Sequence, residues 1–152
     1  MKAIRYHQTG PPDVLCVEEV EEPRAERGQV LVRIEYAGVN FADTLLRRGL
    51  YVLKPEPPVT LGFEAAGVIE QVGEDVCDHL PGDRVALLAN DLYAERAVAT
   101  TNQLVPLPDS IDTRTGAAFP IQALTAYHLL HTAHQLTERQ TVLVHAAAGG
   151  VG

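Results

Sequence analysis

The stretch QVLVRIEYAGVNFADTLLRRG, residues 29–49, combines the patterns of two different secondary structures. Residues 29–39 alternate apolar and polar side chains, which predicts a strand because successive strand residues point to opposite faces of a sheet. One face is expected to carry the apolar side chains and the other the charged ones: Val30, Val32, Ile34 and Tyr36 against Arg33 and Glu35.

The second half of the stretch has the pattern of a short helix. Asn40 is a residue type that often caps a helix N-terminus, and residues 41–48 can form the helix itself. Gly49 can then end it, because glycine readily adopts the left-handed conformation found after helices. We therefore predict a strand that leads directly into a capped helix.

Short strand-like segments fill most of the first hundred residues. Turns rich in Gly, Pro and Asp separate them, at residues 10–13, 23–28, 73–75 and 81–83. Many short strands with such turns indicate a compact β-barrel or sandwich. The further expected strands are residues 2–7, 14–20, 65–72, 84–89 and 94–99.

The pattern changes after Pro108. Asp112 or Thr113 can cap a helical turn that runs to Phe119, and residues 121–135 form the best long helical pattern in the chain. Residues 141–145, TVLVH, are apolar and β-branched and predict a buried strand. We therefore expect a change of domain near residues 110–122.

A glycine-rich loop, AAAGGVG, follows that strand directly. Glycines in such a loop allow a tight turn and let backbone N–H groups approach a pyrophosphate. Ala147, Gly149 and Gly152 occupy the three small positions of a dinucleotide-binding loop. Taken alone, the loop fits a plain turn about as well as a phosphate site.

Composition excludes several classes of protein. The formal net charge is −8 with no basic cluster, so nucleic acid and anionic membranes are not expected as partners. The N-terminus is too polar for a signal peptide, and no apolar run is long enough to span a membrane, so we expect a cytoplasmic protein. Cys16 and Cys77 form no C-x-x-C motif and are interpreted as small apolar fillers.

The motifs, taken in order, resemble the medium-chain dehydrogenase/reductase superfamily, and within it the zinc-free, zeta-crystallin-like quinone oxidoreductases. The resemblance covers essentially the whole chain. The stretches that carry it are MKAIRYHQTGPPDVL, VLVRIEYAGVNFADTLLRRGLY, LGFEAAGVIEQVGEDV, PGDRVALL, GAAFPIQALTAYHLL and VLVHAAAGGVG.

The resemblance implies two domains. Residues 1–115 would form a mainly β, GroES-like barrel on the substrate side, and residues 116–152 would begin an α/β Rossmann domain that binds NADPH. By that template the chain is truncated within the cofactor domain, although a naturally short protein remains open. The full-length form is expected to be a homodimer.

Two positions that hold zinc ligands in related alcohol dehydrogenases carry other residues here. Asn40 stands where those alcohol dehydrogenases have a cysteine, and Phe63 stands where they have a histidine. Phe cannot bind a metal, and Asn is a poor zinc ligand. Without a Lewis acid the reduction of an already electrophilic acceptor is favoured over alcohol dehydrogenation.

The resemblance implies roles for two residues near the reacting atoms. Asn40 would hydrogen-bond the nicotinamide ribose or the substrate, and its alternative role is the helix cap. Tyr51 would contact the nicotinamide or donate to a quinone oxygen, and its alternative role is to anchor the proline-rich loop at residues 50–58.

Further cofactor contacts are expected near the end of the chain. Gly149, Gly150, Val151 and Gly152 would hold the pyrophosphate. Thr125 would line the nicotinamide pocket, with an ordinary place on the helix surface as its alternative.

Acidic and imidazole side chains in the motifs are assigned structural roles. Glu64 is expected to be a buried acid that ties the wall of the site together, and Asp43 is expected to orient its neighbours. His128, His131 and His134 rotate around the helix, which favours a solvated face over a metal site. We predict no metal ligands.

The predicted function is an NADPH-dependent, zinc-independent oxidoreductase that reduces a quinone or an activated enone. One alternative is an enoyl reductase of a lipid or polyketide pathway. The other is that these residues alone are a catalytically inactive binding or structural module.

Overall fold

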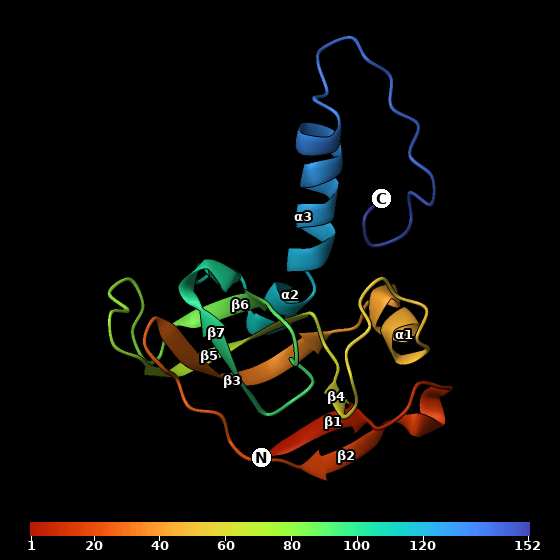
Figure 1. The fold of residues 1–152 in the computed structure, drawn as a ribbon. Coiled ribbons are helices and arrows are strands. Elements are labelled where there is room, and N and C mark those ends of the chain that lie inside the picture. Colours follow the sequence, from red (N-terminus) through yellow and green to blue (C-terminus); the bar gives the residue numbers. More distant parts are fainter.

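Two antiparallel β-sheets and a projecting helical segment make up residues 1–152 in the computed structural model (Figure 1). The larger sheet has five strands in the order β7-β3-β5-β6-β8, and every neighbouring pair is antiparallel. The mainly β fold predicted for this part of the chain is confirmed. The strands of the larger sheet are β3 (Gln29–Gly38), β5 (Glu64–Val72), β6 (Arg84–Leu88), β7 (Arg96–Thr100) and β8 (Leu104–Pro106).

A smaller sheet lies beside the first and has the order β2-β1-β4. Its strands are β1 (Lys2–Tyr6), β2 (Cys16–Glu19) and β4 (Val59–Thr60). The Ile4 N–H donates to the Tyr93 carbonyl at 2.7 Å, and Ala3 forms an isolated bridge with Ala94. These contacts fasten β1 to the connection between β6 and β7.

The main core lies on the inner face of the larger sheet. Val30 and Val32 of β3 are fully buried, as the alternation predicts. The register between β3 and β5 shifts after Ile34, and this bulge leaves Tyr36 49% exposed, so the buried face ends earlier than the sequence pattern does. The cluster consists of Val30, Val32, Ala65, Ile69, Val85, Leu87, Leu92, Ala97, Ala99 and Leu104.

The helices begin close to the predicted caps. Helix α1 (Phe41–Arg47) follows Asn40, and Gly49 has a φ of 71° just after it. In α2 (Thr113–Ala117) the Asp112 carboxylate accepts from the Thr115 N–H at 2.7 Å. The predicted helix at residues 121–135 is α3 (Pro120–His128), which continues as a π-helical turn (Leu129–Ala133).

The prediction of a strand at residues 141–145 is wrong. Residues 141–144 have no regular structure and residues 145–148 form a turn. A strand needs a neighbour for its N–H and C=O groups, and no strand of either sheet lies beside this segment. Figure 1 shows the segment leaving the far end of α3 and returning alongside it.

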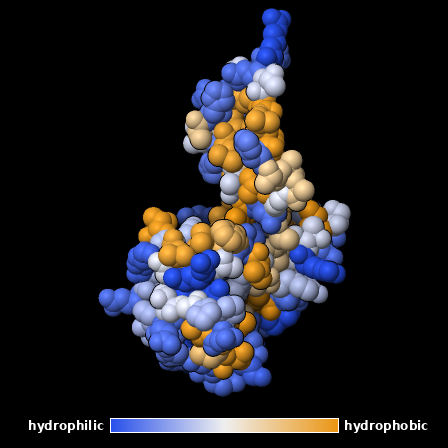
Figure 2. All heavy atoms as spheres, turned by 90° about the vertical axis from the view of Figure 1, so that its right-hand side faces the viewer, coloured by the Kyte–Doolittle hydropathy of each residue, from blue (hydrophilic) through white to orange (hydrophobic).

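Apolar side chains remain exposed on this projecting part of the molecule, as Figure 2 shows. None of the helices has the length and apolar character that crossing a bilayer requires. The exposed apolar residues on and after α3 are Leu124, Tyr127, Leu129, Leu130, Leu136, Val142, Leu143, Val144 and Val151.

Some local details differ from the sequence expectations. Strand β2 starts at Cys16 because Pro12–Val14 form a 3₁₀ turn, and the short strands β4 and β8 are additional. Cys77 is exposed, so its interpretation as an apolar filler is wrong, and Cys16 is only partly buried.

Replacing Leu87 with Ala tests the main core. Leu87 is fully buried, so we expect the free energy of unfolding to fall by about 3 kcal/mol through lost burial and a cavity. The matched control is Leu80→Ala, where the side chain is 66% exposed and the change should stay below about 0.5 kcal/mol. Urea denaturation measures both, and equal effects of the two substitutions would contradict this assignment of the core.

Candidate functional site

Asn40 lies at the junction between β3 and α1, and its backbone and side chain have different partners. The Asp43 carboxylate accepts from the Asn40 backbone N–H at 2.8 Å, which fixes the first turn of α1. The Asn40 side-chain amide donates through Nδ2 to Glu64 Oε1, also at 2.8 Å. Asn40 therefore occupies the N-cap position of α1, while its side chain reaches across to β5.

Glu64 connects that junction to the base of α3. Glu64 is the first residue of β5 and is only 1% exposed. Oε1 accepts from Asn40, and Oε2 accepts from the Ile121 backbone N–H at 2.9 Å. A carboxylate at a helix N-terminus satisfies an N–H that has no partner within the helix, and it also meets the positive end of the helix dipole. The prediction that Glu64 is a buried structural acid is consistent with these bonds.

Gly38 makes room for this carboxylate. A Cβ built at Gly38 would collide with the Glu64 side chain and would lie 2.6 Å from the Ala117 carbonyl oxygen. The Gly38 carbonyl also accepts from the Tyr93 hydroxyl at 3.2 Å. The sequence patterns did not single out Gly38 or Tyr93, although a glycine at the end of a good strand signals a close approach of another group.

The Tyr93 phenol is a weaker acid than usual in this setting and keeps its proton. Burial raises the pKa of Tyr93 well above its usual range, and the negative charge of Asp43 raises it further. Asp43 is itself buried, and its Oδ1 has no hydrogen-bond partner in the chain. Tyr93 therefore stays protonated and acts as a fixed donor to the Gly38 carbonyl.

Tyr51 packs with Phe63, the residue directly before Glu64 in the sequence. Its ring and that of Phe63 are tilted by 45°, with centroids 5.9 Å apart. Both rings pack against a small core that includes Tyr6, Leu46 of α1 and Leu61. Phe63 therefore supports Tyr51 and offers no atom that could bind a metal.

The remaining predicted residues lie along α3, away from Glu64. Thr125 is exposed and lines a surface hollow with Ile121 and His128. The glycine loop lies on another side of the helix, where Gly150 is in close contact with the Gln122 side chain. The structure thus joins Asn40 and Glu64 by a hydrogen bond, but it does not bring Thr125 and the glycines into one pocket.

The glycine loop nevertheless has free hydrogen-bond donors. The Gly149 N–H donates to the Ala146 carbonyl at 2.7 Å, whereas the N–H groups of Gly150, Val151 and Gly152 have no backbone acceptor. A Cβ at Gly152 would lie 2.6 Å from the Ala146 oxygen, so this loop conformation requires glycine there. Three free N–H groups fit an anionic ligand such as a pyrophosphate.

The imidazoles of His128, His131 and His134, on and after α3, are all exposed. His128 Nδ1 lies 2.9 Å from Thr132 Oγ1, and the His131 ring lies against Tyr127 at a centroid distance of 4.5 Å. These neighbours differ from one histidine to the next, which fits the expected solvated helix face.

Sequence comparison relates the chain to known proteins. It matches the family described as alcohol dehydrogenase GroES-like domain over residues 26–109. It is 40% identical to the quinone oxidoreductase of Rattus norvegicus, with 100% of this chain aligned to 47% of that protein. It is 42% identical to the synaptic vesicle membrane protein VAT-1 homolog of Danio rerio, over 86% of this chain and 27% of that protein. The chain thus spans about half the length, or less, of these curated relatives.

Solved structures give the same relationship. The human synaptic vesicle membrane protein VAT-1 homolog-like protein superposes with a TM-score of 0.96 at 32% identity, covering 100% of this chain and 50% of that one. Escherichia coli quinone oxidoreductase complexed with NADPH gives 0.83 at 32% identity, covering 89% and 42%. The JamJ enoyl reductase gives 0.91 at 30% identity, covering 99% and 48%.

Replacing Glu64 with Ala should destabilise the junction more than an ordinary surface change. Two donors, on Asn40 and Ile121, would lose their acceptor, and we expect a loss of about 3 kcal/mol in the free energy of unfolding. Glu74→Ala removes an exposed acid and serves as the control, with an expected effect below about 0.5 kcal/mol. Chemical denaturation followed by circular dichroism measures both, and a Glu64→Ala variant as stable as the control would refute the role of Glu64.

Proposed function

The chain belongs to the alcohol dehydrogenase GroES-like domain family and is similar over its whole length to quinone oxidoreductases, and from that membership we propose that it forms the substrate side of an NADPH-dependent reductase. The proposed acceptor is a quinone or an activated enone. The proposed reaction needs no zinc.

This proposal rests on Asn40 and Phe63, which stand where related alcohol dehydrogenases have zinc ligands. The Asn40 amide nitrogen is already bonded to Glu64, and the Phe63 ring packs on Tyr51. Neither side chain supplies the thiolate or imidazole that a catalytic zinc takes in such enzymes. An acceptor that is already electrophilic suits a site of this composition, because positioning then accounts for most of the catalysis.

NADPH would supply the hydride when it is bound. The residues proposed to hold it are Gly149, Gly150, Val151 and Gly152, whose loop has free N–H donors for the pyrophosphate. Thr125 would lie on the nicotinamide side. The similarity to Escherichia coli quinone oxidoreductase, which was solved in complex with NADPH, supports this assignment.

Asn40 and Tyr51 are the proposed catalytic residues. Because Glu64 holds the Asn40 NH₂ group, the orientation of the side-chain amide is fixed, and its oxygen has a lone pair that would accept from a ribose hydroxyl or from the substrate. The Tyr51 phenol can donate to the oxygen of the acceptor as electron density builds there. Glu64 is then a positioning residue that acts through Asn40.

An enoyl reductase is the second candidate. The similarity to the JamJ enoyl reductase favours it, and an α,β-unsaturated thioester is also an activated acceptor. Comparing the rate of NADPH oxidation with a quinone and with an enoyl thioester separates the two reactions. Faster turnover of the thioester would support the second candidate.

The test is a steady-state assay of the protein that carries this chain together with a complete cofactor domain. We expect quinone-dependent oxidation of NADPH, and kcat/KM should fall by about 10- to 100-fold in Tyr51→Phe and in Asn40→Ala. Tyr36→Phe is the control, since Tyr36 lines a different surface hollow, with Lys2 and Glu95. No turnover with any quinone, enone or enoyl thioester would refute the proposed function.

A further inference from the structure

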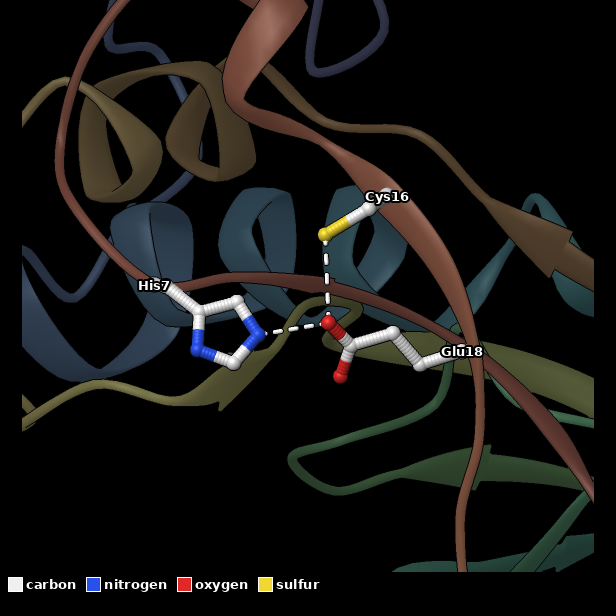
Figure 3. A group of neighbouring side chains, drawn as sticks. All are labelled: His7, Cys16 and Glu18. Atoms are coloured by element: carbon white, nitrogen blue, oxygen red, sulfur yellow. Dashed lines mark hydrogen bonds and ion pairs between the residues drawn. The ribbon is translucent and has the colours of Figure 1, made fainter.

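A histidine, a cysteine and a glutamate meet at one end of the smaller sheet (Figure 3). His7 directly follows β1, and Cys16 and Glu18 belong to β2. Glu18 Oε1 lies 2.5 Å from His7 Nε2 and 3.3 Å from Cys16 Sγ. One donor atom from each residue lies within 4.8 Å of the other two.

Sheet geometry brings the three side chains together. Residues two apart on a strand point to the same face, so Cys16 and Glu18 lie side by side. The pairing of β1 with β2 sets Arg5 opposite Cys16 and places His7 just past the last pair. The sequence separates His7 from Cys16 by a Pro-rich turn, which hides the cluster from any simple ligand motif.

The donor set matches the preference of zinc. Zinc takes thiolate sulfur at about 2.3 Å and imidazole nitrogen or carboxylate oxygen at about 2.0–2.2 Å, so tetrahedral ligands lie roughly 3.3–3.7 Å apart. The distance from Cys16 to Glu18 already fits. His7 must move away from Glu18 by about 1 Å to reach the same range, and its side chain is 57% exposed, which leaves the ring free to turn.

We propose that His7 Nε2, Cys16 Sγ and Glu18 Oε1 bind a zinc ion, with water as the fourth ligand. A thiolate and a carboxylate together balance the charge of the ion, and the neutral imidazole completes the protein ligands. The site lies outside the residues proposed for NADPH and substrate, and it does not depend on that function.

Arg5 is the positive neighbour that such a site must tolerate. Its Nη1 lies 3.5 Å from Glu18 Oε2, the oxygen that does not face His7 and Cys16. Its Nη2 also donates to the Pro58 carbonyl at 3.3 Å. Arg5 thus holds one carboxylate oxygen and leaves the other for the ion, as neighbouring groups commonly do around metal ligands.

Zinc binds cysteine as the thiolate, so binding at this site is coupled to loss of the Cys16 proton. Binding of the ion releases the thiol proton to solvent, so affinity should rise with pH.

An ion here would stabilise the turn between β1 and β2. That turn also contacts α1, because the Gly10 N–H donates to the Arg47 carbonyl at 3.0 Å. Binding of a ligand to the folded state alone raises its stability. We therefore expect zinc to increase the thermal stability of the protein.

The first test uses cobalt as a spectroscopic substitute for zinc in the chelator-treated protein. We expect one Co²⁺ per chain with a thiolate-to-metal absorption band, displaced by Zn²⁺. Cys16→Ser should abolish the band, and His7→Ala should weaken binding by at least about 10-fold. Cys77→Ser and a variant with Asn at His128, His131 and His134 should bind as the unmodified protein does.

A band that persists in Cys16→Ser, or one that disappears in Cys77→Ser or the triple histidine variant, would overturn the proposal.

A second measurement needs no substitution. Zn²⁺ should protect Cys16 from alkylation by iodoacetamide while Cys77, which is exposed, still reacts, as mass spectrometry of the peptides would show. Equal alkylation of Cys16 with and without Zn²⁺ would also overturn it.

Discussion

The buried carboxylate of Glu64 is the constraint on which the rest of the candidate site depends. It accepts one hydrogen bond from Asn40 and one from the first turn of α3, so a single side chain fixes the end of β3 relative to that helix. A buried acid that lost either partner would carry a large desolvation cost. Gly38 is required beside it, because any side chain there would occupy the space of the carboxylate.

The consequences of this arrangement reach the proposed chemistry. Asn40 cannot rotate freely while Glu64 holds its NH₂ group, so the amide oxygen has a defined direction. Phe63, the residue directly before Glu64 in the sequence, packs against Tyr51. Related alcohol dehydrogenases have zinc ligands at the positions of Asn40 and Phe63. An oriented amide and a supporting aromatic ring at these positions favour a site that works by positioning its ligands, not by polarising them with a metal ion.

The sequence was informative where local patterns and structure agree. Alternation identified β3, Asn40 and Gly49 marked the ends of α1, and an acid within the apolar stretch around Glu64 indicated a buried partner. It failed where distant segments decide the outcome. Residues 141–145 have strand composition but no strand to pair with, and the cluster of His7 with Cys16 and Glu18 depends on the register of a hairpin.

The central claim is that Glu64 acts on the cofactor site through Asn40. A double-mutant cycle on the dissociation constant of NADPH tests it directly, with Asn40→Ala, Glu64→Gln and the double variant made in the protein with a complete cofactor domain. If Glu64 serves to hold Asn40, the double variant should bind NADPH no more weakly than Asn40→Ala alone. Losses that simply add would show that the two residues act independently and would contradict the claim.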